Sequence, residues 1–255
     1  ADTITSSRRL AGEMNDSDIP LAKVKIIGSI QRINSFRERY GDAHLYLAYH
    51  AAFPLALTPD LLYGLWANFQ RDINGNVLNI PWIAIADLLF SNLCEEVGHE
   101  LYEMEKTVRD LLLRQLKTNS RFGVKRINEL SEFLLFDVQP QLDSSDIDIR
   151  DLAQAQRWAA LAYTQTEEAA RELALILAGL RLEDTTEWAR MTSLIETFSE
   201  PLQEGHFESL LVYIRGMYHF VRGDIETAAL IFDKLPEREE QIEIAGVNLS
   251  IPVQI

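Results

Sequence analysis

Hydrophobic positions recur with helical spacing along most of this chain. Between residues 20 and 41 they fall three or four apart, which predicts an amphipathic helix that ends at Gly41. The spacing is carried by Val24, Ile27, Ile30, Ile33 and Phe36.

The other face of this predicted first helix is basic. Against a single acid, Glu38, it carries the one basic stripe of the chain: Lys23, Lys25, Arg32, Arg37 and Arg39. A charged helix face is usually a solvated face. The alternative is a docking surface, either for an acidic partner or for the acidic body of this same protein. These five residues are the candidate partner-binding site.

The segment from 41 to 118 has the element order of a winged helix. A buried helix ends at Phe53-Pro54, and a second begins at Thr58-Pro59, where a threonine cap precedes a proline at the first helical position. A loop follows, then a third helix over 81–97 that stops at Gly98, a short alternating strand over 99–105, and a helix over 106–117. This order predicts a winged-helix-like domain.

Residues 119 to 236 predict a second, helical domain. An amphipathic helix ends near Pro140, and an acidic linker or cap follows. The alanine- and leucine-rich stretch from 152 to 180 is expected to form two helices that break near Thr164–Thr166. Helices around 184–204 and 206–222 come next.

The last predicted helix pair resembles a tetratricopeptide repeat. Gly216, Ala228 and Phe232 have its spacing, in which small residues let two helices approach and an aromatic closes the pair. One such pair fits an isolated helical hairpin or one unit of an array. Residues 237–255 then alternate around "AGVN", which predicts a β-hairpin or a strand leading into a further domain. With residues 1–40 as a tail and basic helix, the predicted fold class is all-α, mainly helical.

Composition and charge narrow the classes of function. The 255 residues are 47% hydrophobic and 25% charged, as in soluble globular proteins, and the net charge of -15 disfavours broad attraction to nucleic acid or anionic membrane. The single Cys94 fits a reducing compartment, so we expect a cytoplasmic protein. No apolar run reaches the about 18 residues of a membrane span, and the first residues do not form a signal peptide.

The predicted third helix, which would enter a DNA groove, has the wrong chemistry for that role. It carries Asp87, Glu95 and Glu96 but no Lys or Arg, and residues 42–117 hold ten acids and five bases. Groove-reading helices present Arg, Lys, Asn or Gln to bases and cations to phosphates. A winged-helix DNA-binding regulator therefore stays an alternative that needs a dimer or a fused basic segment.

The sequence shows no complete catalytic or metal-binding motif, so we expect no enzyme, no cofactor and no metal site. "HELYE" at 99–103 matches a zinc protease motif only in its first two letters, and Glu96-x-x-His99 has no second copy for a di-iron site. A hydrolase acting through Cys94 and His99 is a third hypothesis, but the adjacent glutamates favour a structural, buried cysteine. The remaining candidates are expected to pack in the core or at its boundary: His44, His50, Trp66, Trp82, Trp158 and Trp188.

Two stretches resemble the winged helix that follows the ATPase core of STAND signalling NTPases. One matches its "FP…LTPELL" corner at Phe53, Pro54, Leu57, Thr58, Pro59, Leu61 and Leu62. The other matches its "hxLHxxxRxxL" segment at Leu101, Met104, Val108, Arg109 and Leu112. Family members often have His where this chain has Glu103 or Met104, and no ATPase core precedes the match here.

A closer resemblance, over about residues 41–235, is to a module of multidomain cyanobacterial conflict (defence) system proteins. Its phrases include "PWIAIADLLFSNLCEEVGHELYEMEKTVRDLLL" and "AQRWAALAYTQTEEAARELA". Some relatives are fused to formylglycine-type, C-type-lectin-like variable domains of diversity-generating retroelements. The resemblance implies a scaffold that works with a MoxR-type or STAND ATPase and a von Willebrand A-type or effector protein. We therefore predict a non-enzymatic interaction module that binds through exposed aromatics and the basic helix face.

Overall fold

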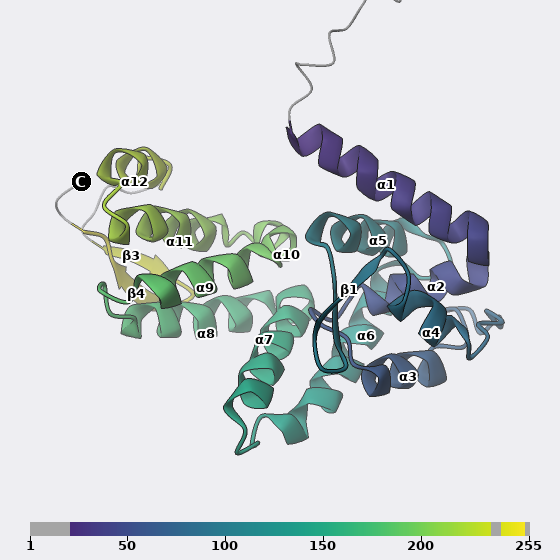
Figure 1. Ribbon diagram of the computed structural model, residues 1–255. Coiled ribbons are helices and arrows are strands. Elements are labelled where there is room, and N and C mark those ends of the chain that lie inside the picture. The colour runs from purple at the N-terminus through teal and green to yellow at the C-terminus, as the bar shows by residue number, and fades with distance from the viewer. Residues whose placement is uncertain (1–20, 236–240, 253–255) are drawn as a thin grey trace, which may run out of the picture.

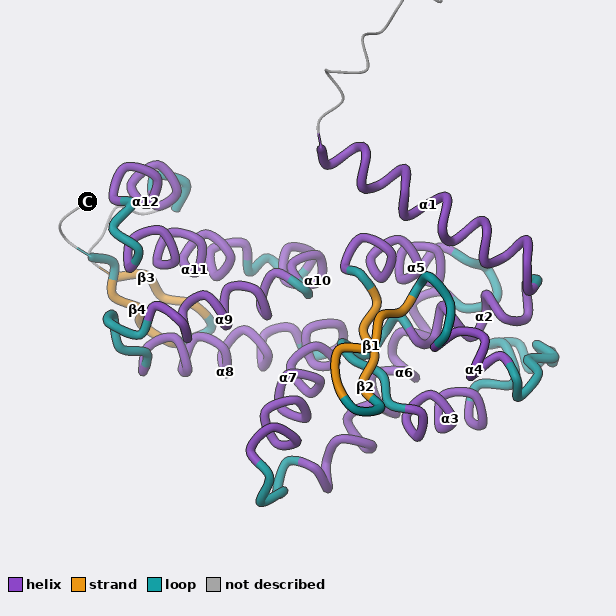
Figure 2. Tube along the Cα trace, viewed as in Figure 1, coloured by secondary structure: helices purple, strands orange, loops and turns teal. Residues whose placement is uncertain are grey.

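The computed structural model describes residues 21–235 and 241–252, with side chains from residue 23 onward. The chain is mostly helical, with two short antiparallel hairpins in the part described, which confirms the predicted fold class. Figure 1 shows two bodies side by side, with α1 lying across the first and projecting from it at its N-terminal end. The path of helices, strands and loops between them is traced in Figure 2.

The first body has the predicted order of helices, with a two-stranded hairpin where a single strand was predicted. It is built from α1 (Leu21–Tyr40), α2 (Asp42–Ala51), α3 (Pro59–Asn68), α4 (Ala84–Leu89), β1 (Cys94–Gly98), β2 (Leu101–Met104), α5 (Lys106–Thr118) and α6 (Gly123–Val138). β1 and β2 form the wing, and an isolated bridge joins Leu57 to Tyr102 through two backbone hydrogen bonds of 2.8 and 2.9 Å. This bridge places the segment between α2 and α3 beside the wing.

Local chemistry explains where these helices begin. Gly41 separates α1 from α2 with φ of 86°, a conformation that glycine adopts without steric cost. Thr58 accepts a hydrogen bond from the Leu61 backbone N–H at 3.1 Å, and Pro59 holds the first helical position, as predicted.

The predicted third helix is too long. The helix spans only Ala84–Leu89, and Cys94–Gly98, placed in that helix by the sequence analysis, is strand β1. Gly98 therefore ends a strand rather than a helix. The physical reason is pairing, because β1 aligns Cys94 with Met104 and Glu95 with Glu103 across an antiparallel ladder. The strand predicted over 99–105 is confirmed as β2.

The second body contains α7 (Ile147–Thr164), α8 (Thr166–Gly179), α9 (Thr185–Glu196), α10 (Ser199–Glu204), α11 (Glu208–Val221), α12 (Ile225–Phe232), β3 (Gln241–Ile244) and β4 (Val247–Ser250). A short 3₁₀ turn, η1 (Gln139–Gln141), precedes it. The break predicted near Thr164–Thr166 is confirmed. The acidic segment acts as a cap, because the Asp146 carboxylate accepts from two backbone N–H groups of α7. The helix predicted around 184–204 is two helices, interrupted at Thr197–Phe198.

The last helix pair, α11 and α12, packs as the spacing predicts. A Cβ added at Gly216 would lie 2.6 Å from the Phe232 ring, so only glycine permits this approach. β3 and β4 form the predicted terminal hairpin and pack against α8.

Two clusters of buried apolar side chains meet on α7. Ala153 and Ala160 belong to the cluster of the first body, while Trp158, Ala159 and Leu161 belong to the cluster of the second. The buried apolar side chains of α6 also join the first cluster.

The predicted domain boundaries near residues 40, 118 and 236 stay predictions. Within the described residues, no helix is long and apolar enough to cross a membrane.

Candidate protein-docking surface

The helix at the recognition position, α4, presents apolar side chains to solvent. Trp82 is 69% exposed and Phe90 is 78% exposed, and Ile83 between them is 42% exposed. Trp82 precedes α4 and Phe90 follows its last residue, so the two exposed aromatic side chains stand at the two ends of this short helix. The prediction that Trp82 packs in the core is wrong, because it precedes the short helix and the buried residues there are Ala84, Leu88 and Leu89.

The other three tryptophans follow the prediction. Trp158 and Trp188 are buried, and Trp66 packs against the first cluster while its indole N–H donates to the Ile80 carbonyl at 2.9 Å. The sequence analysis missed the α4 surface. Its available signal was the apolar spacing of Trp82, Ala86 and Phe90 around a helix too short to bury both faces.

The wing beside α4 is acidic. Glu95 lies directly opposite Glu103 in the ladder, and Glu96 and Glu100 are exposed on the same hairpin. Like charges that face each other across two strands destabilise the pair. No ion pair joins Glu95 or Glu103 to a cation among the residues described, so a partner could supply one.

A groove of about 600 Å³ separates the wing from α7 and α9. Its lining includes the apolar Leu55, Val97 and Leu194, with Glu95 and Glu103 on the wing side. Arg190 lies on the α9 side, where its guanidinium already pairs with Glu187. The groove is therefore lined by apolar side chains, with the carboxylates of Glu95 and Glu103 on the side of the wing.

The five predicted basic residues of α1 do not form one free surface. Arg32 pairs with Glu105 at the start of α5, Arg37 pairs with Asp42 at 2.6 Å, and Arg39 lies over the Tyr40 ring. Lys23 and Lys25 are exposed and have no ion pair within the described chain. Three of the candidates are thus engaged by this protein's own groups, and two lysines remain open to a partner.

Glu105 anchors the middle of α1. Burial opposes ionisation of its carboxyl, but hydrogen bonds from Thr107, Arg32 and Ser29 outweigh that effect and lower its pKa. N-terminal to this anchor, the apolar side chains of α1 leave the core. Exposed fractions of 40–52% at Val24, Ile26, Ile27 and Ile30 contrast with 2% at Ile33 and Phe36.

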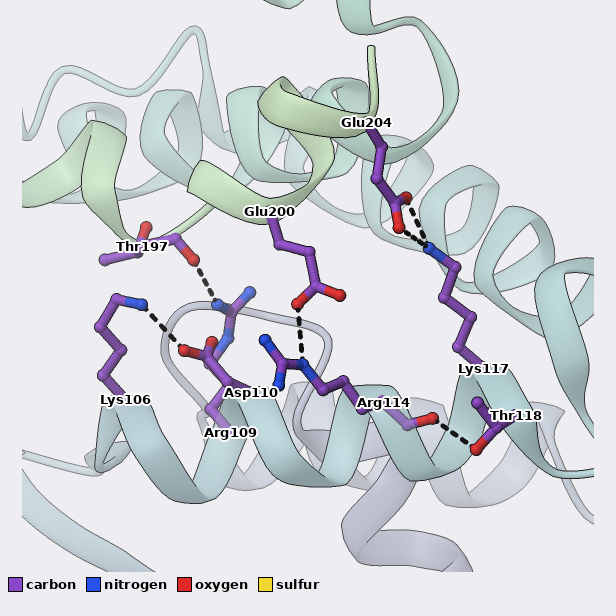
Figure 3. A network of polar contacts seen from close by, with 9 residues as sticks. All are labelled: Lys106, Arg109, Asp110, Arg114, Lys117, Thr118, Thr197, Glu200 and Glu204. Carbon is purple, nitrogen blue, oxygen red and sulfur yellow. Dashed lines mark hydrogen bonds and ion pairs between the residues drawn. The ribbon is translucent and has the colours of Figure 1, made fainter. Parts of the chain in front are cut away.

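A buried arginine connects the two bodies. Arg109 on α5 is 3% exposed and donates to the carbonyls of Phe53 at 2.9 Å, Pro54 at 3.3 Å and Thr197 at 3.0 Å. The Thr197 carbonyl belongs to the C-terminal end of α9, where helix carbonyls carry partial negative charge. Figure 3 shows this arginine reaching toward Thr197 from α5.

The corner around Phe53 and Pro54 is also held from α7. The Gln156 side chain accepts from the Leu55 N–H at 2.7 Å and donates to the Ala56 carbonyl at 2.8 Å. Thus the corner at Phe53 and Pro54 is held by Arg109 of α5 and by Gln156 of α7.

Two surface ion pairs cross the same junction. Arg114 contacts Glu200 at 3.3 Å, and Lys117 contacts Glu204 at 2.5 Å, both between α5 and α10 (Figure 3). Exposed pairs of this kind contribute about 0–1 kcal/mol each. The buried arginine is therefore expected to dominate the polar part of this junction.

The histidines expected in the core or at its boundary lie there. His50 is fully buried, accepts a 2.8 Å hydrogen bond from Arg126 and stacks on Phe69. Burial, followed by the Arg126 charge, lowers the pKa of His50 to about 3. His44 lies 3.1 Å from Asp87 and ties α2 to α4.

The structure also places the candidates for chemistry. Burial raises the pKa of Cys94 to about 12, which keeps the thiol protonated, and His99 lies in the turn of the wing. The zinc-protease and di-iron spacings need both ligands on one helix face, whereas residues 96–103 form a hairpin. No cluster of three or more metal-ligating side chains occurs within residues 21–235 and 241–252.

Comparison of this chain with protein-family models, with curated proteins and with solved structures finds no match.

Proposed function

We propose that this protein is a non-enzymatic interaction module that docks another protein on the exposed face of α4. The observation that supports this most is the pair of aromatic side chains, Trp82 and Phe90, at the helix position that other winged helices use to enter DNA. Exposed Trp and Tyr side chains and their apolar neighbours are frequent anchors of protein interfaces.

The charge of the same surface favours protein over nucleic acid. Beside the aromatic face stand Glu95, Glu96 and Glu100 of the wing, which would repel phosphates. A protein partner with apolar and basic groups would gain from both features. The resemblance to conflict-system modules suggests an ATPase-type partner, MoxR-type or STAND, in a bacterial defence signalling system.

Affinity capture of the tagged protein from its native cells, in moderate salt and with mass spectrometry, tests the proposal. We expect a stoichiometric ATPase-type partner that is lost from the Trp82→Ala/Phe90→Ala variant. Phe136→Ala is the matched control, because Phe136 is 81% exposed but lies on α6. Truncating interface anchors should weaken binding by more than about 1 kcal/mol.

Two results would contradict the proposal. Partner capture that is equal for the double variant and the control removes α4 as the docking surface. Recovery of nucleic acid alone, released by salt, would favour the alternative of a winged-helix DNA-binding regulator.

A further inference from the structure

The projecting half of α1 and the groove beside the wing have complementary chemistry. Val24, Ile26, Ile27 and Ile30 form an apolar ridge that this chain leaves about half exposed. Lys23 and Lys25 lie on the same exposed segment of the helix and have no ion pair within the described residues. This ridge is an amphipathic helix segment with an unburied apolar face and free positive charge.

The groove beside the wing has apolar side chains and carboxylates that match this ridge. Val97, Leu152 and Leu194 supply apolar walls, and Glu95 and Glu103 on the wing side have no ion pair among the described residues. The cations of the lining are already engaged: Lys106 pairs with Asp110, Arg190 pairs with Glu187, and Arg109 donates to backbone carbonyls. A basic, apolar helix would cover the walls and place ammonium groups beside two carboxylates that otherwise repel each other. The charges without an ion pair among the described residues, Lys23 and Lys25 on the ridge and Glu95 and Glu103 in the groove, are opposite in sign, as at complementary interfaces.

The two features are adjacent on one molecule. Glu105 lines the groove and also binds Ser29 and Arg32, which lie at the C-terminal end of the ridge. Figure 1 shows the N-terminal end of α1 directed away from the body that anchors its C-terminal part. Ile33 and Phe36, both 2% exposed, hold that part against the first core.

The exposed ridge of α1 and the groove that would receive such a ridge lie side by side on one chain. This arrangement suits a two-fold dimer. In an isologous interface, residue i of one copy contacts residue j of the other, and j contacts i in return. We infer that two copies of this chain associate by exchanging α1 ridges, each ridge lying in the groove of the other copy. This contact uses the groove and not the α4 face, so it does not depend on the proposed partner function.

Charge-swapped variants of the full chain test the exchange. Lys23→Glu/Lys25→Glu places acids on the ridge, and Glu95→Lys/Glu103→Lys places bases in the groove. Sedimentation equilibrium over a range of concentrations should give twice the 29.1 kDa chain mass for the wild type. Each variant alone should dimerise at least about tenfold more weakly, because both of its contacts become like-charged.

Mixing the two variants gives the decisive measurement. In the mixed dimer both contacts regain opposite charges, so an equimolar mixture should recover the dimer mass while neither variant alone does. Lys234→Glu, an exposed site without an ion pair among the described residues, should associate like the wild type. Wild type that stays monomeric, or a mixture that fails to associate, would overturn the inference. The rescue also separates this result from misfolding, since a misfolded variant would not pair.

Discussion

Arg109 offers the sharpest test of how the two bodies are joined. Its guanidinium is buried and donates to three backbone carbonyls, two at the FP corner and one at the end of α9. Arg109→Ala removes all three donors and leaves those carbonyls without them, two of them at buried contacts. A single buried polar group without its partner costs about 1–3 kcal/mol.

The magnitude follows from these contacts. The loss of three hydrogen bonds does not add up in full in the free energy of unfolding. The reason is that the alanine variant also avoids the cost of burying a guanidinium. Hydrogen bonds to a charged group contribute about 1.5–3 kcal/mol each, and the avoided burial of the guanidinium offsets part of their sum, so we expect a loss of about 3–5 kcal/mol in the free energy of unfolding. Arg109→Lys keeps the charge but loses the fork of donors, so it should fall between wild type and alanine.

Urea unfolding followed by circular dichroism measures the effect, with equal m-values required before midpoints are compared. Arg114→Ala is the matched control. It lies on the same helix and spans the same junction, but its 3.3 Å contact to Glu200 is exposed. We expect the control to lose less than about 1 kcal/mol. An Arg109→Ala variant as stable as this control would refute the role assigned to the buried arginine.

Three further predictions concern Gly216, His50 and Cys94. Gly216→Ala should lower unfolding stability by about 1–3 kcal/mol because its Cβ would meet the Phe232 ring at 2.6 Å, whereas Gly28→Ala meets nothing within 4 Å and should be neutral or stabilising in the same thermal melts. The unfolded His50 ring binds a proton near pH 6.5 but the folded ring only near pH 3, so stability should fall on acidification between these values, by about 2 kcal/mol from pH 6.5 to 5 relative to His50→Gln. An equal pH dependence in the two proteins would contradict this. Cys94 should resist a mild alkylating agent until denaturation because burial raises its pKa to about 12, and rapid native labelling detected by mass spectrometry would revive the hydrolase hypothesis.

Helix positions were the most predictable part of the fold. The cap at Thr58-Pro59, the break near Thr164–Thr166 and the close approach at Gly216 all follow from local chemistry, and the structure has them where expected. Each depends on groups only a few residues apart or on one helical hairpin. Such signals survive folding because they do not depend on what lies opposite in space.

The end of α4 shows where local pattern fails. Cys94–Gly98 follows the apolar residues of α4 directly, and so short a segment does not by its pattern distinguish a helix from a strand. Pairing with β2 decided the outcome, and the exposure of Trp82 depended on which face of a short helix the core covers. The same limit applies to α1, whose helical spacing does not reveal where its apolar residues leave the core.

The sequence by itself determined the helical class, the order of the helices, the terminal hairpin and the acidic character of residues 95–105. Periodicity, caps and charge depend on residues that are close together in the sequence, so they can be predicted from the sequence alone. Only the tertiary structure decided that Arg109 joins the FP corner to α9, that Arg32 and Arg37 are engaged, and that Lys23 and Lys25 are not. Contacts between residues as far apart as Arg109 and Thr197 depend on how whole elements pack, and no spacing along the chain records that packing.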